Sequence, residues 1–347
     1  MYTYEESLEA SIKYFNGNEL AAKVWVDKYA LRDNDDNLLE LTPDDMHKRL
    51  AKEFARIESK YKNPLTFDEI FKLFQNFEYI IPQGSPMSVI GDNYRIQSVG
   101  NCFTLRSPLD SYGGILYTDQ EIAQLSKRRC GVGLDISNIR PKGMQTKNAA
   151  RTTDGIRIFM ERFSNTIREV GQGGRRAASL QSISVHHPEI ETFITSKQDI
   201  EKITGANISV KFTEEFMNAL YNGSEYEQRW PVEGKPQITK IVSAQKIWNL
   251  FIKCAHHTSD PGAFYWSNVE KNSIANEYGT KYSEFKDNTS NPCLTGDSII
   301  STKLGLFKLK DLLNKYIEPI IDNRFGKDDI KDIKNIGTSI VTSTQVK

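Results

Sequence analysis

Gly131-Val132-Gly133-Leu134-Asp135-Ile136 is the stretch that decides the fold class. It is a short and almost continuous apolar run, which is typical of a strand that is buried on both faces. Similar runs and stretches of helical spacing alternate on either side of it. The expected strands are 102–105, 131–136, 180–185 and 206–212, and the expected helices are 119–129, 153–170 and 213–221. This alternation predicts an α/β fold around a parallel sheet.

The region before this alternation reads as helical. Thr42-Pro43-Asp44-Asp45 supplies an N-cap, a proline at the first helical position and two acids in the first turn. Thr66 with Glu69 forms a capping-box pattern that begins a second helix. We therefore expect a helical N-terminal region over residues 1–90.

Bulk composition restricts the class of protein. Lys plus Arg and Asp plus Glu both number 45 in 347 residues, which argues against a protein that coats nucleic acid. The acidic N-terminus lacks the apolar core of a signal peptide, and there is no apolar run of membrane-spanning length. We expect a cytoplasmic protein with neither a membrane nor a nucleic acid as partner. The 4 cysteines lack paired spacing, so neither a metal site nor a fixed disulfide is predicted.

Seven short motifs give the chain a resemblance to the large subunit of ribonucleotide reductase, over residues 81–293. They stand in the order of that family: Ser85-Pro86, Asn101-Cys102-Phe103, Asp110-Ser111-Tyr112, Arg129-Cys130-Gly131-Val132-Gly133, Arg140-Pro141-Lys142-Gly143, Gly171-Gln172-Gly173-Gly174-Arg175-Arg176 and Ser290-Asn291-Pro292-Cys293. The resemblance implies that residues 91–292 form the first part of the reductase α/β barrel.

The resemblance also implies a substrate site. Cys102 matches one of the two thiols that supply electrons, although a cysteine before an apolar strand is otherwise most simply a buried small hydrophobe. Thioredoxin or glutaredoxin would then restore the dithiol. Ser85, Asn101 and Gly131 match positions that contact the ribonucleotide; the alternative is that Ser85 and Gly131 are plain turn residues.

A second set of residues resembles the allosteric specificity site, which implies a homodimeric enzyme with a deoxynucleoside triphosphate or ATP, with Mg, as effector. The matching residues are Asp110, Ser111, Tyr112, Arg140 and Lys147. An acid can hold a sugar hydroxyl or a magnesium-linked group, and cations can hold phosphates. The alternative is a solvated charged loop.

The junction at Cys293 departs from the reductase pattern. In the family the radical-bearing cysteine of Asn-Pro-Cys is followed two residues later by a glutamate that serves as the base, and the asparagine positions the substrate. Here Asn291 matches, but Thr295 replaces the glutamate. For the radical source, the resemblance favours adenosylcobalamin; the alternative is a separate metal-containing small subunit.

The residues from Cys293 onward explain this departure, because Cys293-Leu294-Thr295-Gly296-Asp297 resembles the start of an intein. Its first residue is the nucleophile that attacks the carbonyl of Pro292. Residues 293–347 would be the N-terminal piece of a β-rich intein domain, with a strand at 298–301, a short helix near 310–316 and a β-leaning segment at 337–347. The alternative is an ordinary loop, strand and helix. No histidine follows Cys293, so splicing would require a C-terminal partner fragment.

The expected function is therefore the N-terminal half of a ribonucleoside-diphosphate reductase large subunit, completed by protein splicing. The alternative is a catalytically incompetent fragment that binds nucleotides and effectors. Whether the substrate is a di- or a triphosphate stays open, with the diphosphate favoured.

Overall fold

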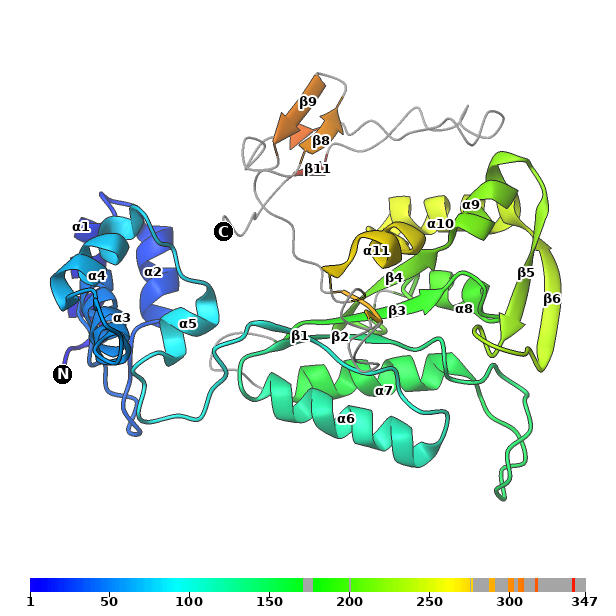
Figure 1. The fold of residues 1–347 in the computed structure, drawn as a ribbon, viewed down its shortest axis with the longest axis horizontal. Coiled ribbons are helices and arrows are strands. Elements are labelled where there is room, and N and C mark those ends of the chain that lie inside the picture. Colours follow the sequence, from blue (N-terminus) through cyan, green and yellow to red (C-terminus); the bar gives the residue numbers. More distant parts are fainter. Residues whose placement is uncertain are drawn as a thin grey trace. The chain divides into compact units, whose positions relative to one another are not determined.

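The computed structural model describes residues 1–170, 177–199, 201–274, 276, 287–290, 299–302, 305–308, 316–317 and 339–340 (Figure 1). The chain divides into two compact units. The first comprises 1–103, 119–132 and 165–178, and the second comprises 104–118, 133–164 and 179–347. Within the described residues, no helix is both long and apolar enough to cross a membrane.

The N-terminal part of the first unit is helical, as predicted. Its helices are α1 (Tyr4–Tyr14), α2 (Glu19–Lys28), α3 (Pro43–Glu58), α4 (Phe67–Phe74), the 3-10 turn η1 (Gln75–Phe77) and α5 (Gly84–Val89). Helix α3 begins at the predicted N-cap Thr42, which also forms a capping box with Asp45, and α4 begins at the predicted capping box of Thr66 and Glu69. Their apolar faces join one buried core: Trp25, Val26, Leu38, Met46, Leu50, Ala51, Ile70 and Phe74.

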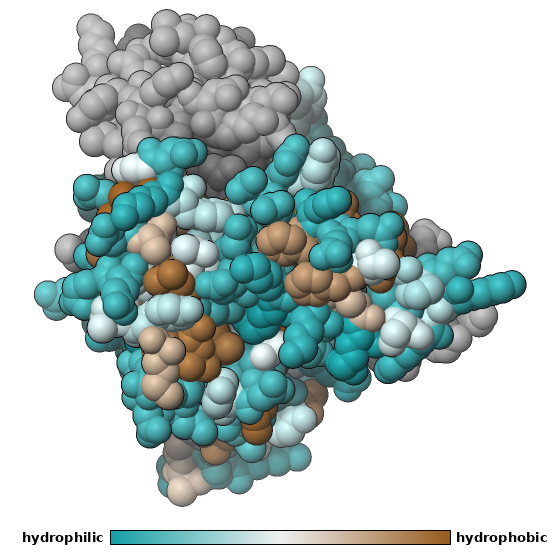
Figure 2. Space-filling view, turned by 90° about the vertical axis from the view of Figure 1, so that its left-hand side faces the viewer, coloured by the Kyte–Doolittle hydropathy of each residue, from teal (hydrophilic) through white to brown (hydrophobic). Residues whose placement is uncertain are grey.

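These helices also leave apolar surface accessible. Between α3, α4 and the segment that leads into α5 lies a cavity of about 290 Å³ whose lining includes Leu50, Phe74 and Pro86. Figure 2 shows hydrophobic patches between hydrophilic areas on one side of the molecule. The exposed hydrophobic residues of α3, α4 and the segment after them are Phe54, Ile57, Tyr61, Leu65, Phe67, Tyr79, Ile80 and Ile81. Part of the apolar surface of this region is therefore open in this chain.

A five-stranded sheet follows, and its order confirms the α/β prediction. The strands are β1 (Cys102–Thr104), β2 (Gly131–Asp135), β3 (Ser179–Ser184), β4 (Ala206–Phe212) and β7 (Gly262–Tyr265), in the order β1-β2-β3-β4-β7. The pairs β3–β4 and β4–β7 are parallel. All residues of β2 and β3 are buried, because these strands lie inside the sheet.

Helices pack against the sheet and one another. They are α6 (Tyr112–Ser126), α7 (Ile156–Glu169), α8 (Ile190–Thr195), α9 (Glu214–Tyr221), α10 (Ala244–Thr258) and α11 (Trp266–Asn272). At the end of β4, the Phe212 ring packs against Phe216 of α9 and against Trp248 of α10. Figure 1 shows α9 and α10 side by side next to this strand. On α7, the carbonyl of Met160 accepts a hydrogen bond of 3.1 Å from the Gln181 side chain of β3.

Several elements differ from the prediction, and β7, α8 and α11 were not predicted. Helix α6 begins at Tyr112 and not at 119, because the Ser111 hydroxyl accepts a hydrogen bond of 3.1 Å from the N–H of Gly114 and so caps a turn that contains two glycines. The antiparallel hairpin of β5 (Glu225–Trp230) and β6 (Ile238–Ser243) was not predicted at all. In β5, the polar Gln228 occupies a buried position, so apolar and polar residues do not alternate along that strand.

After Cys293 the described residues form short antiparallel pairs. Strand β8 (Ile299–Thr302) pairs with β9 (Gly305–Lys308), and β10 (Tyr316–Ile317) pairs with β11 (Ser339–Ile340). The predicted strand at 298–301 and the β-leaning end of the chain are thus strands where they are described. The helix predicted near 310–316 falls mostly outside the described residues, and its last residue, Tyr316, is in a strand.

Candidate functional site

The four predicted substrate residues meet in the first unit. The N–H of Ser85, in the first turn of α5, donates a hydrogen bond of 2.8 Å to Oδ1 of Asn101. The side-chain amide N–H of Asn101 donates to Oε1 of Gln83, and the backbone carbonyl of Asn101 accepts a hydrogen bond of 2.6 Å from the N–H of Gly131. Cys102 follows directly as the first residue of β1. Asn101 thereby joins α5 to β1 and β2.

The groups in this cluster fit a ligand-binding role. The Ser85 hydroxyl oxygen is buried and has no hydrogen-bond partner among the described residues, which is rare for a buried polar atom. The Cys102 side chain is exposed. An added Cβ at Gly131 would lie 3.4 Å from the Ala178 carbonyl oxygen, so packing alone does not demand glycine there. A small hydroxyl and an accessible thiol at one place suit a polar substrate.

Arg49 of α3 holds the helix that carries Ser85. Its guanidinium donates to the carbonyl oxygens of Met87, at 3.0 Å, and of Ile90. It also forms a buried ion pair of 2.7 Å with Glu40, whose other oxygen accepts a hydrogen bond of 2.8 Å from the N–H of Leu31. Sequence reasoning missed Arg49, because its partners are far away in the chain.

The predicted effector residues lie in the second unit, where Asp110 and Arg140 pair with each other. Asp110 accepts hydrogen bonds from the N–H of Arg140, at 3.0 Å, and from its Nε, at 2.7 Å. The guanidinium also donates to the carbonyl of Gln145 at 2.6 Å. About a quarter of each side chain remains exposed, at 28% for the arginine and 22% for the aspartate. An incoming phosphate would thus find an arginine that is already oriented.

The other predicted effector residues lie close to Asp110 or Arg140 along the sequence. Ser111 caps α6, and Tyr112 begins that helix with its ring edge-on to Phe159 at a centroid distance of 5.9 Å. Tyr112 is 64% exposed, so one face of the ring is open. Lys147 is exposed, in the loop between β2 and α7.

The loop that carries Arg140 and Lys147 is fixed near its base by the segment after β3. His187 donates from Nε2 to the carbonyl of Ile139, at 2.9 Å, and its Nδ1 accepts from the N–H of Glu189, at 3.1 Å. The Glu189 carboxylate accepts hydrogen bonds of 3.0 Å from the N–H groups of Lys142 and Ile156. Burial lowers the pKa of His187 to about 4 and raises the pKa of Glu189.

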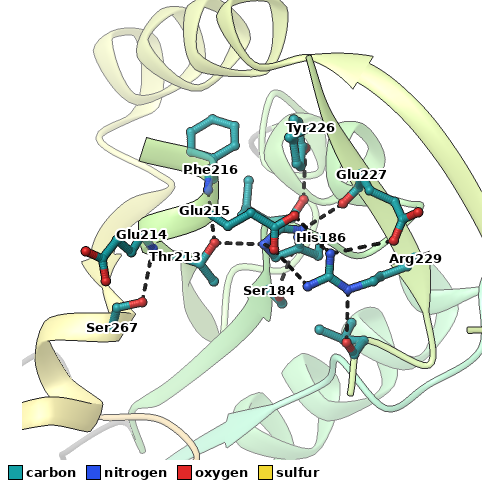
Figure 3. Close-up of polar contacts among 12 residues, drawn as sticks. Ser184, His186, Thr213, Glu214, Glu215, Phe216, Tyr226, Glu227, Arg229 and Ser267 are labelled. Carbon is teal, nitrogen blue, oxygen red and sulfur yellow. Dashed lines mark hydrogen bonds and ion pairs between the residues drawn. The ribbon is translucent and has the colours of Figure 1, made fainter. Parts of the chain in front are cut away.

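The adjacent His186 has different partners, from the β5–β6 hairpin and α9 (Figure 3). Its Nδ1 donates to the Glu227 carbonyl at 2.7 Å, and its Nε2 accepts from the Thr213 hydroxyl at 2.7 Å. Arg229 of the hairpin donates to the Glu215 carboxylate at 3.1 and 3.0 Å. Hydrogen bonding to that arginine lowers the pKa of Glu215, and burial lowers the pKa of His186. This cluster is structural, because every group in it is matched within the protein.

The same hairpin reaches the effector region. Trp230 donates from its indole N–H to the Asn138 carbonyl at 3.1 Å, and its ring lies 6.0 Å from the guanidinium carbon of Arg140. Arg140 therefore contacts a strand that is separated from it by 90 positions in the sequence. Nothing in the sequence indicates this contact.

Residues 287–290, just before the junction, lie against the sheet. The Ser182 hydroxyl donates to that of Thr289 at 2.8 Å, and Lys211 donates to the Asn288 carbonyl at 3.1 Å. Asn291 and Cys293 themselves lie outside the described residues, as does the glycine-rich segment 171–176. Cys130 and Cys254 are buried, which indicates that they are core residues. In the described part of the chain, no three metal-ligating side chains come together.

Two family models match this chain. The model described as "Ribonucleotide reductase, barrel domain" matches residues 100–295, and the one described as "Ribonucleotide reductase, all-alpha domain" matches residues 15–88. The first match alone covers more than half of the 347 residues.

Curated relatives agree with these matches. The vitamin B12-dependent ribonucleoside-diphosphate reductase of Thermoplasma acidophilum is 26% identical over 270 residues, which cover 71% of this chain and 34% of that protein. The enzyme of the same name from Mycobacterium tuberculosis is 27% identical over 257 residues, covering 72% and 36%. The ribonucleoside-diphosphate reductase large subunit of Variola virus is 26% identical over 212 residues, covering 52% and 27%. The chain spans about a third of the length of the first two relatives. The chain belongs to the ribonucleotide reductase family.

Proposed function

We propose that this chain is the N-terminal part of a ribonucleotide reductase large subunit that converts ribonucleoside diphosphates into deoxyribonucleoside diphosphates. The observation that carries the proposal is the cluster of Ser85, Asn101 and Gly131 next to the exposed thiol of Cys102, in a chain of this family. The diphosphate is favoured because two of the relatives are named ribonucleoside-diphosphate reductases that depend on vitamin B12.

The chemistry assigned to these residues balances as follows. The ribose 2′-hydroxyl leaves as water, and two electrons come from two thiols that become one disulfide. Cys102 is one of these thiols, and the second belongs to a part of the enzyme outside this chain. Thioredoxin or glutaredoxin then reduces the disulfide. The buried Ser85 hydroxyl gains its missing hydrogen bond from the substrate. Asn101, which hydrogen-bonds to both Ser85 and Gly131, holds these two residues in place.

Asp110, Arg140, Ser111, Tyr112 and Lys147 form the proposed specificity site of a homodimeric enzyme. The Arg140 guanidinium, held by Asp110, would bind the phosphates of a deoxynucleoside triphosphate or ATP, with Mg bound to the same phosphates. Lys147 would add a second cation. The exposed ring of Tyr112 can stack on a nucleobase.

Adenosylcobalamin is the proposed cofactor, since the relatives from Thermoplasma acidophilum and Mycobacterium tuberculosis are named vitamin B12-dependent reductases. When bound, it supplies the radical from which the thiyl radical is generated. Among the residues that the structure describes, no cluster of metal-ligating side chains fits the cobalt, so we assign none of them to hold it.

Splicing at Cys293 completes the proposal. The thiol attacks the carbonyl of Pro292, the amide becomes a thioester, and a C-terminal fragment with the rest of the intein and of the reductase continues the reaction. Asn291 stays in the joined enzyme and positions the substrate. The cysteine that follows Pro292 after ligation becomes the radical site. Support comes from the absence of the expected glutamate at position 295, where the sequence has Thr295.

One experiment separates the two chemistries. The purified chain is mixed with a C-terminal fragment that begins with the missing intein part, and the products are followed by intact mass and by deoxyribonucleotide formation. Cys293→Ala should abolish ligation, whereas Cys102→Ala should allow ligation but abolish sustained reduction. If the wild-type chain binds effector but never ligates, the proposal of splicing is wrong and a nucleotide-binding fragment is the better description.

A further inference from the structure

Lys211 has a buried ammonium group on β4 whose partners come from three different segments. Its Nζ donates to the Asp135 carboxylate of β2 at 2.8 Å and to the Asn288 carbonyl at 3.1 Å. The same nitrogen lies 4.0 Å from the centroid of the Trp266 ring. Both side chains of the ion pair are almost fully buried, with 9% of the lysine and 8% of the aspartate exposed.

The residues next to Asn288 are held by the neighbouring strands. The Thr289 hydroxyl, itself buried, accepts the hydrogen bond from Ser182 of β3. At Gly133 of β2, an added Cβ would lie 2.5 Å from the carbonyl oxygen of Ser290, so only glycine permits this approach. Three consecutive residues are thus held by β4, β3 and β2 in turn.

We propose that Lys211 is a positioning residue, which fixes residues 287–290, the described residues that directly precede Asn291, Pro292 and position 293. A charged lysine is costly to bury, and an apolar pair in place of the ion pair would stabilise the fold as well. Unlike an apolar side chain, the Lys211 ammonium donates a directional hydrogen bond to the Asn288 carbonyl. It can therefore fix the position of that residue. The effect on chemistry at position 293 rests on the proposed function; the anchoring of 287–290 does not.

The anchoring is tested by residue-resolved hydrogen exchange on the full chain. The reporter is the N–H of Asp287, which donates to Asn276 Oδ1 at 3.0 Å. Lys211→Met should speed its exchange by about tenfold or more, while the amides of β3 stay protected. Because Lys211→Met leaves Asp135 unpaired, the double variant Asp135→Asn with Lys211→Met is measured too and should show the same local effect.

Lys197 offers a matched control at the other end of β4. It donates to the Asp260 carboxylate at 2.6 Å and to the Ala206 carbonyl at 2.7 Å, so it has the same kinds of partner but none in 287–290. Lys197→Met should speed exchange at Ile208, whose N–H donates to Asp260 at 3.2 Å, and leave Asp287 unchanged. Unchanged exchange at Asp287 in the double variant, or an equal loss of protection across the sheet, would overturn the anchoring.

The consequence for catalysis is measured on the joined enzyme. Lys211→Met should lower kcat by about tenfold or more, because the substrate-positioning Asn291 and the radical site both follow the segment that Lys211 fixes. Lys211→Arg should recover part of the loss, and Lys197→Met should keep the wild-type kcat. A wild-type kcat in Lys211→Met would refute the positioning role. If the wild-type enzyme shows no reduction, the proposed function fails, and the exchange result still decides the anchoring.

Discussion

The Asp110 carboxylate binds both the backbone N–H and the side chain of Arg140, at 3.0 and 2.7 Å. One residue therefore fixes the start of the loop and the direction of its arginine. Since this ion pair is partly exposed, we expect it to contribute no more than about 1 kcal/mol to stability.

Arg140→Met should therefore lower the affinity for the effector strongly while it changes the free energy of unfolding only slightly. We expect an increase of about tenfold or more in the Kd for a deoxynucleoside triphosphate, measured by calorimetry. Arg157→Met is the control, because that arginine pairs with Glu161 on the solvent side of α7 at 3.4 Å. Equal affinity of Arg140→Met and the wild type would exclude Arg140 from the effector site.

Ser85→Ala should leave the free energy of unfolding of the chain almost unchanged. The Ser85 hydroxyl has no partner among the described residues, so its removal breaks no hydrogen bond there, whereas ribonucleotide binding should weaken by about 1 kcal/mol. Ser88→Ala removes a hydroxyl that donates to the Gly84 carbonyl at 2.9 Å and serves as the comparison. A large loss of stability in Ser85→Ala alone would show that the hydroxyl serves the fold.

Arg49→Met should destabilise the helical region by about 3–5 kcal/mol, because it leaves the buried Glu40 carboxylate without its cation. Denaturant unfolding monitored by tryptophan fluorescence measures the loss, since Trp25 lies in that core. Arg56→Met breaks an exposed pair of 2.8 Å with Glu53 on the same helix and should cost below about 1 kcal/mol. Similar losses in the two variants would contradict the role given to Arg49.

Acid should weaken the part of the structure that His187 supports. Its pKa is about 4 in the folded chain, well below the pKa of 6.5 of an unperturbed histidine, so the unfolded chain binds the proton more readily. The stabilisation from the neutral ring is complete above pH 6.5 and is lost as the pH falls towards 4, by roughly 3 kcal/mol in all. His187→Gln removes this group, so the difference in unfolding free energy between wild type and variant should shrink over that range. A constant difference would contradict the assignment.

The sequence predicted those elements whose signal is local. The apolar runs of β2 and β4, the N-cap at Thr42 and the capping box at Thr66 need no tertiary information, and the structure has them within a residue or so. The hairpin β5–β6 was missed because Gln228, a polar residue, occupies one of its buried positions.

In the candidate site, too, local sequence signals predicted the residues but not the contacts between residues that are distant in the sequence. Cys102, Ser85, Asn101 and Gly131 were found through motifs, but their contacts were not. The unpartnered hydroxyl of Ser85 and the support from Arg49 depend on which backbone groups approach them in the folded chain. No spacing in the sequence encodes that approach.

The central claim is that Cys102 belongs to the active site of a ribonucleotide reductase. The most direct measurement is the yield of deoxyribonucleoside diphosphate by the joined enzyme, with adenosylcobalamin and reduced thioredoxin, for wild type and Cys102→Ser. We predict many turnovers for the wild type and none for the variant, while effector binding stays equal. Turnover of Cys102→Ser at the wild-type rate would contradict the account.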